Sequence, residues 1–274
     1  MTEQTFTASP IGPVNAYVTS HIGRILVIAD HRTTKATVEI STTATEGSIA
    51  KAVEDATIRQ EGDQIEVRVP KIEGASGGMS STTMMVGGST FTFHGSGGGV
   101  QMVGGDIFMG GQKIVSNGMV VAAEGTVVGG AAGTGEITVT LRLPEMSSVQ
   151  VTTTSADVST AGDVLQVLDV DSQSGDIQAE TVRDLRVKTM SGDVEVTRVD
   201  CEVNIGTMSG DVEIGAYNGT RFSVNTMSGD IDASATPIAS GRMDIKSMSG
   251  DITTRGAEHL NPRCGSMSGR IRTR

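Results

Sequence analysis

A three-residue phrase, Ser-Gly-Asp, returns at a nearly constant interval through the second half of this chain and limits its fold more than any other feature. Aligned on their third position, successive occurrences lie 19, 17, 18, 19, 21 and 19 residues apart. A period of this length is typical of repeat proteins, whose units are too short to fold alone and stack on their neighbours. The first repeat has Ala in place of Gly (Ser155-Ala156-Asp157), and the last has Arg in place of Asp. The third positions are Asp157, Asp176, Asp193, Asp211, Asp230, Asp251 and Arg270.

Apolar residues alternate with polar ones on both sides of each phrase. In one repeat Val203 and Ile205 precede the phrase, and Val212 and Ile214 follow it. A period of two indicates half-buried strands, while Gly, Ser and Asp together favour a tight corner. The sequence therefore predicts an all-β protein, a parallel β-solenoid (β-helix) with narrow two-strand rungs of about 18 residues.

Stacked rungs would align the six Asp residues in one column, here called the Asp column. Neighbouring carboxylates about 5 Å apart repel each other by about 1 kcal/mol in water. Backbone N–H groups of the turns are the favoured counterweight, and a bound cation is the alternative. We do not expect calcium, because its sites converge several oxygen ligands on one point. Arg270 replaces the last Asp, and residues 16–27 fit the same template with Arg24 in the Asp position, so Arg24 and Arg270 are candidate end caps.

A Met stands just before the Ser in five of the repeats, and two roles are open for this Met ladder. Met fills irregular space, so the favoured interpretation is that stacked Met side chains plug the end of the narrow core. The alternative is an exposed apolar stripe used for adaptable binding. The residues are Met190, Met208, Met227, Met248 and Met267.

Composition divides the chain into three parts. Residues 1–70 are predicted to be β-rich and solenoid-like, with one short helix at 47–57. Residues 71–135 form a Gly/Met/Val-rich insertion, predicted to be β-structure in short rungs or hairpins, or partly disordered, with disorder favoured for 74–81. Residues 136–274 form the repeat solenoid.

The repeats follow the run Glu-Ile-Thr-Val-Thr-Leu-Arg-Leu-Pro at residues 136–144 and a short β-rich N-terminal part. This arrangement resembles the bacterial DUF4097 family, whose members are described as β-strand-repeat proteins or proposed adhesins. The resemblance covers residues 136–274 well and residues 10–70 more loosely. It implies the repeat fold and an adhesin-like role, and it brings no catalytic or binding residue with it.

The net charge of −11 and the absence of any basic run argue against binding to nucleic acid or to an anionic membrane surface. No segment approaches 18 apolar residues, so no membrane insertion is expected. The N-terminus lacks the features of a secretion signal, which predicts a cytoplasmic protein. The four histidines, including His21 and His31, show no metal-ligand spacing, so neither a metal nor a cofactor is predicted.

These observations predict a non-enzymatic structural or interaction protein, an adhesin-like solenoid that presents a binding surface to a protein partner. The alternative is a self-assembling cytosolic scaffold that polymerises through the solenoid ends or through residues 71–135. A distant alternative is a carbohydrate-active β-helix enzyme working from aligned carboxylates. Basic partners and aromatic platforms for sugar rings are not evident in the sequence, and turn chemistry already accounts for the periodic Asp.

Overall fold

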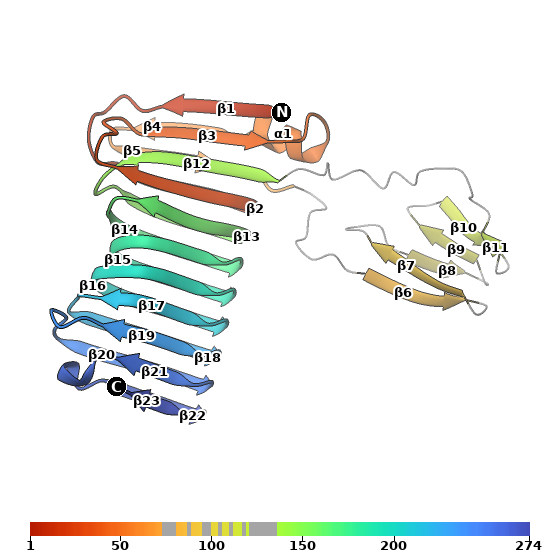
Figure 1. Ribbon diagram of the computed structural model, residues 1–274. Coiled ribbons are helices and arrows are strands. Elements are labelled where there is room, and N and C mark those ends of the chain that lie inside the picture. Colours follow the sequence, from red (N-terminus) through yellow and green to blue (C-terminus); the bar gives the residue numbers. More distant parts are fainter. Residues whose placement is uncertain are drawn as a thin grey trace.

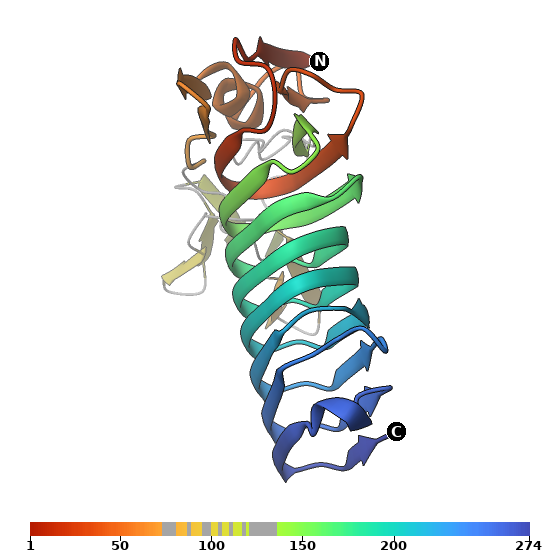
Figure 2. The same cartoon turned by 90° about the vertical axis from the view of Figure 1, so that its left-hand side faces the viewer.

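The computed structural model describes residues 1–72 and 136–274, together with the backbone of six strands between residues 81 and 120. Residues 136–274 and part of the N-terminal segment form a parallel β-solenoid of about seven turns, which confirms the predicted fold. The rungs stack into a tall column, from the red N-terminal strands to the blue C-terminal ones (Figures 1 and 2).

Each rung places one strand segment on each of two facing sheets, and the Ser-Gly-Asp corner joins the two. We call the sheet before the corner the first face and the sheet after it the second face. The first face consists of β5 (Gln64–Arg68), the first halves of β2 (Asn15–Asp30) and β13 (Ser148–Gly162), β14 (Leu165–Ser174), the second halves of β15 (Ile177–Ser191) and β16 (Val194–Ser209), β18 (Arg221–Ser228), β20 (Arg242–Ser249) and β22 (Arg263–Ser268). The second face consists of β12 (Ile137–Pro144), the second halves of β2 and β13, the first halves of β15 and β16, β17 (Val212–Tyr217), β19 (Ile231–Ala235), β21 (Ile252–Arg255) and β23 (Ile271–Thr273).

The core is the narrow space between the two faces. Strand register keeps equivalent residues of successive rungs in line, so the apolar positions form continuous buried columns. One such column contains Val187, Ile205, Val224 and Ile245, each 1% exposed or less. Aliphatic side chains of similar size therefore fill the core, which is why a chain with only 3% aromatic residues can still form a well-packed core.

The N-terminal part departs from purely parallel rungs. Strand β1 (Thr2–Thr7) pairs antiparallel with β3 (Thr37–Thr42), and β3 pairs antiparallel with β12. Strand β4 (Thr57–Glu61) pairs antiparallel with β5. The predicted helix is present as α1 (Ser48–Glu54), which buries its apolar side chains in the core and contacts β1 and β3. It ends before residue 57 because that residue already begins β4.

The insertion begins where a corner would otherwise lie. Strands β5 and β12 pair with the two halves of β2, so the chain between them leaves and rejoins the solenoid at the edge that carries the Ser-Gly-Asp corners. Its described strands pair antiparallel, as hairpins and not as parallel rungs. The disorder predicted for 74–81 falls almost entirely outside the described residues. The strands are β6 (Ser81–Val86), β7 (Ser89–His94), β8 (Val100–Val103), β9 (Asp106–Met109), β10 (Gln112–Ser116) and β11 (Met119–Val120).

At the opposite edge, the second face returns to the first through loops of varying length. The longest of these loops in the repeat region carries the one-turn 3-10 helix η1 (Glu258–Leu260), and Leu260 is buried. These loops explain why the period varies between 17 and 21 residues while the corners stay in register.

Candidate interaction surface at the Ser-Gly-Asp corners

In the corners from residue 175 onward, consecutive rungs stack so closely that only Gly fits at the centre, whereas Ala156 takes this position in the first corner of the series. Gly210 has a φ of +131°, and a Cβ atom built on it would lie 2.2 Å from the carbonyl oxygen of Gly192 in the preceding rung. The Gly residues of the neighbouring corners show the same close approach. A residue with a side chain would meet both backbone strain and collision here, which gives the Gly of the repeat its physical reason.

The Asp column is held by backbone hydrogen bonds. In each corner, Oδ1 of the Asp accepts a hydrogen bond from the backbone N–H of the equivalent residue in the next rung. The donor–acceptor distances are 3.0 Å for Asp176 to Asp157 and for Asp193 to Asp176, 2.8 Å for Asp211 to Asp193, and 2.7 Å for Asp230 to Asp211, Asp251 to Asp230 and Arg270 to Asp251. Hydrogen bonds to ionised carboxylates are among the stronger ones in proteins. These backbone hydrogen bonds offset the repulsion between neighbouring carboxylates, as the sequence predicted.

The two arginines take different places relative to the column. Arg270 lies at the C-terminal end of the Asp column, where its backbone N–H donates the last hydrogen bond of the series, to Oδ1 of Asp251. Arg24 lies beside Asp157 in register, but β12 pairs on its other side, and its Nε is 4.0 Å from Oε1 of Glu136. Arg24 therefore ends the Asp column without capping the solenoid, which corrects the expectation of an end cap there.

The Met ladder lies on the outer surface of the first face, so the prediction that it plugs the core is wrong. The alternation of the strands explains this, because each Met follows a residue, Thr or Ser, that already fills the space beside the corner. Thr189, for example, is 6% exposed, and its hydroxyl donates to the carbonyl of Ser191 at 3.0 Å. The exposed fractions are 54% for Met190, 47% for Met208 and Met227, 49% for Met248 and 82% for Met267.

Four of the Met residues line an open groove of about 720 Å³ on this surface. The row next to the Met ladder contains small residues, Gly206 and Gly265, which leave room beside the thioether side chains. Lys246 lines the same groove. The result is an apolar channel parallel to the solenoid axis, with the corners along one side.

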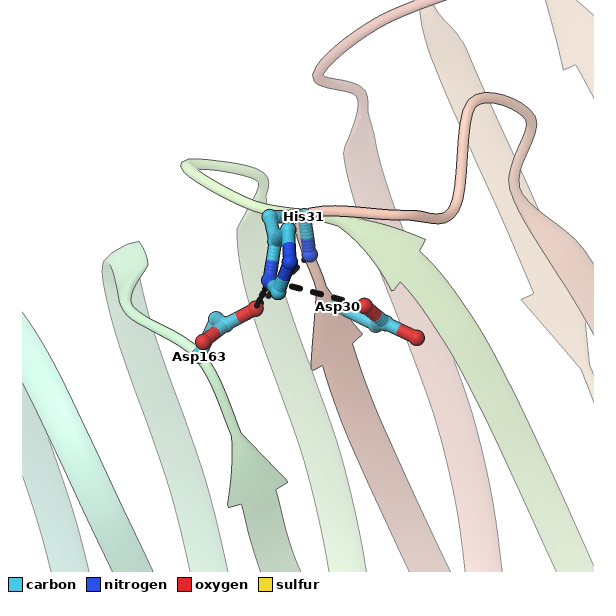
Figure 3. Close-up of side chains that lie close together, drawn as sticks. All are labelled: Asp30, His31 and Asp163. Atoms are coloured by element: carbon cyan, nitrogen blue, oxygen red, sulfur yellow. Dashed lines mark hydrogen bonds and ion pairs between the residues drawn. The ribbon is translucent and has the colours of Figure 1, made fainter.

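A second cluster lies at the opposite edge of the solenoid, where β2 ends and where β13 turns into β14 (Figure 3). Oδ2 of Asp163 accepts a hydrogen bond from the backbone N–H of His31 at 2.7 Å and lies 2.6 Å from Nδ1 of the same residue. Oδ1 of Asp30 is 3.7 Å from that Nδ1. The backbone hydrogen bond from His31 holds the pKa of Asp163 below its usual value.

One imidazole and two carboxylates within 4.8 Å of one another have the ligand chemistry of a divalent-metal site. The two short contacts between His31 and Asp163 are instead those of a hydrogen-bonded pair that links neighbouring rungs. Sequence reasoning missed the cluster, because Asp163 is 132 residues away from His31. Only the paired register of β2 and β13 brings them together.

A family model for Toastrack DUF4097 matches residues 28–272. The chain belongs to this family. The match covers nearly all of the repeat region and confirms the resemblance seen in the sequence. A search of curated proteins finds no match.

Solved structures that match this Toastrack chain share little sequence with it. A proposed adhesin from Bacteroides fragilis is 12% identical, with 99% of this chain and 97% of that chain covered and a TM-score of 0.46. A proposed lipid-binding protein from Parabacteroides distasonis is 11% identical, with coverage of 100% and 97% and a TM-score of 0.42. A proposed adhesin from Parabacteroides merdae is 10% identical, with coverage of 100% and 96% and a TM-score of 0.36.

Among the described residues of this Toastrack protein, no helix has both the length and the apolar character needed to cross a membrane.

Proposed function

We propose that this Toastrack protein is a non-enzymatic interaction module that binds an amphipathic helix of a partner protein along its Met ladder. The observation that carries the proposal is the row of five exposed Met side chains on a regular β-scaffold. Met is unbranched and polarizable, so a Met-lined surface adapts to partner side chains. An adhesin-like role is the broader form of this proposal.

The spacing of the ladder suits a helix better than an extended segment. Rungs of a parallel solenoid stack about 4.8 Å apart, so five Met residues extend over roughly 19 Å. An α-helix presents one apolar position per turn about every 5.4 Å, and four turns cover roughly 22 Å. An extended chain presents side chains on one face about every 6.8 Å and loses register with the ladder sooner. Helix-in-groove binding is an established recognition mode.

The charges beside the groove specify the partner further. The Asp column lies along the corner side of the Met ladder, and Lys188 and Lys246 occupy the row on its other side. A partner helix with basic residues along one edge of its apolar stripe and acidic residues along the other would match both sides. Such complementarity fixes orientation and speeds association more than it adds affinity.

The proposal is tested with a designed 18-residue helical peptide that has Leu at helical spacing, Lys along one edge and Glu along the other. We expect saturable binding by fluorescence anisotropy and a loss of about tenfold or more in the Met208→Glu/Met227→Glu variant. A Gln178→Glu/Thr253→Glu variant adds the same charge to the second face and is expected to bind normally. Binding that is equal for the designed and a scrambled peptide, or unchanged in the Met variant, would overturn the proposal.

Light scattering across a concentration series separates this proposal from the scaffold alternative. A fixed mass is expected for a module that presents a surface, whereas a mass that climbs without limit would indicate a polymerising scaffold instead. The cytoplasmic location expected from the N-terminal sequence remains a prediction.

A further inference from the structure

A cleft of about 800 Å³ lies on the outer surface of the first face at its N-terminal end, apart from the Met ladder. Strands β4, β5, β2 and β13 supply its lining. We propose that this cleft is a carbohydrate-binding site that takes a short neutral oligosaccharide. This inference goes beyond the proposed helix-binding function and shares no residue with it.

One cross-strand row forms the centre of the cleft. Arg59 pairs with Glu66, Glu66 with Tyr17, and Tyr17 with Gln150, each on the next strand of the sheet. Neighbouring strands lie about 4.8 Å apart, so the row extends over roughly 14 Å. That length and the open form of the cleft suit a few linked sugar units better than a single compact ligand.

The residue types fit a sugar. Tyr17 is 40% exposed, and among the described residues no Phe or other Tyr is exposed to this extent. An exposed ring offers an apolar face on which the C–H face of a sugar can stack, while its hydroxyl remains available for hydrogen bonding. On either side of Tyr17, the carboxylate of Glu66 and the amide of Gln150 match sugar hydroxyls, which both donate and accept hydrogen bonds.

The charges favour a neutral ligand. Arg59 offsets one of the two carboxylates in the lining, and Arg68 Nη2 lies 2.8 Å from Oε1 of Glu66. Without an excess of cationic side chains, the cleft lacks the features of a phosphate or nucleotide site. The ion pair also holds the Glu66 side chain in place at the centre of the row.

Hydrogen bonds within the protein hold the wall of the cleft in place without a ligand. In the β4–β5 hairpin, Gln60 accepts a hydrogen bond from the backbone N–H of Ser9 at 3.1 Å and donates one to the carbonyl of Gly62 at 2.9 Å. The floor is a continuous hydrogen-bonded sheet. A preformed site of this kind loses little conformational entropy on binding.

The tyrosines provide a direct readout. The chain has two Tyr and no Trp, and Tyr217 is fully buried. A change in tyrosine fluorescence on adding ligand therefore reports on Tyr17. We expect a saturable change with at least one member of a panel of short cello-, malto-, xylo- and chito-oligosaccharides, titrated into the full-length protein. No saturable change with any member of the panel would overturn the proposal.

Variants then locate the site, with isothermal titration calorimetry replacing fluorescence. Tyr17→Ala is expected to weaken binding at least about tenfold, while Tyr17→Phe, which keeps the ring, stays within about threefold of the wild type. Gln150→Ala is expected to weaken binding, whereas Gln178→Ala, which removes an exposed amide from the second face, leaves it unchanged. Wild-type affinity in Tyr17→Ala, or equal loss in the two Gln variants, would refute the assignment. The Met208→Glu/Met227→Glu variant is expected to bind sugar normally, so the two proposals fail independently.

Discussion

Replacing Gly210 with Ala places a methyl group at the closest contact between two consecutive rungs. The new Cβ would lie 2.2 Å from the carbonyl oxygen of Gly192 and 2.8 Å from its carbonyl carbon. Real Cβ atoms essentially never approach closer than 3.0 Å, so the corner must open by roughly 0.8 Å. The φ of +131° adds strain that no movement of the neighbour relieves.

The expected cost follows from these two effects. An L-residue in such a backbone conformation costs about 1 to 2 kcal/mol. Opening the corner also weakens two hydrogen bonds between these two rungs, from Val194 N–H to the carbonyl of Asp211 at 2.9 Å and from Asp211 N–H to Oδ1 of Asp193 at 2.8 Å. At about 1 kcal/mol for each bond, the free energy of unfolding should fall by about 3 to 4 kcal/mol.

The matched control is Gly206→Ala, four residues earlier in β16. A Cβ on Gly206 meets nothing within 4 Å, and its φ lies outside the left-handed region. Its substitution should leave the free energy of unfolding within about 0.5 kcal/mol of the wild type or raise it slightly. Urea unfolding, monitored by circular dichroism, measures the stability of both variants. The dependence of the free energy of unfolding on urea concentration is compared as well, because repeat proteins can unfold with reduced cooperativity. Equal midpoints for the two variants would refute the close-contact argument.

Three further predictions concern the corner, the histidine cluster and the Met ladder. Asp211→Ala removes the acceptor for the N–H of Asp230 and should lower the free energy of unfolding by about 1 kcal/mol. Asp211→Asn keeps an acceptor oxygen and should have a smaller effect. Urea midpoints compare the two variants, and equal losses would contradict the role of the hydrogen bonds in the Asp column. The pKa of Asp163 is lower in the folded state than in the unfolded state. The stability that its ionised carboxylate contributes is therefore complete above the unfolded pKa of about 3.9 and is lost as the pH falls through the folded pKa. Asp163→Asn should therefore lose less stability than the wild type between pH 6 and pH 2, and parallel pH profiles of the urea midpoint would argue against this. Hydrogen peroxide should oxidise the exposed ladder faster than Met243, which is fully buried, as read by peptide mass spectrometry; uniform oxidation would show that the ladder is not exposed. The ladder residues to compare are Met190, Met208, Met227, Met248 and Met267.

The sequence predicted the repeat region well because its information is local. Period-two alternation around each phrase determines which side chains face the core, and the constant distance between phrases aligns them. A single repeat is enough to show this, because Ile205 before the phrase and Ile214 after it occupy inward positions in the pattern, and the structure buries both.

Other features depended on pairing between distant segments, which no local pattern encodes. The Met ladder is an exception, because the local alternation itself places each Met on the outer surface, and the ability of Met to fill irregular space is the argument that misleads. The antiparallel strands β1 and β3 and the insertion at the corner edge follow from how the chain returns to the solenoid.

By itself, the sequence determined the solenoid, its rung length, and the tight turn at each corner. The tertiary structure alone decided which separate segments share a surface. Tyr17 meets Gln150, and His31 meets Asp163, because β2 pairs with β13 across more than a hundred intervening residues. Backbone hydrogen bonds between strands set these neighbours, and such bonds have no residue-specific signature in a single sequence.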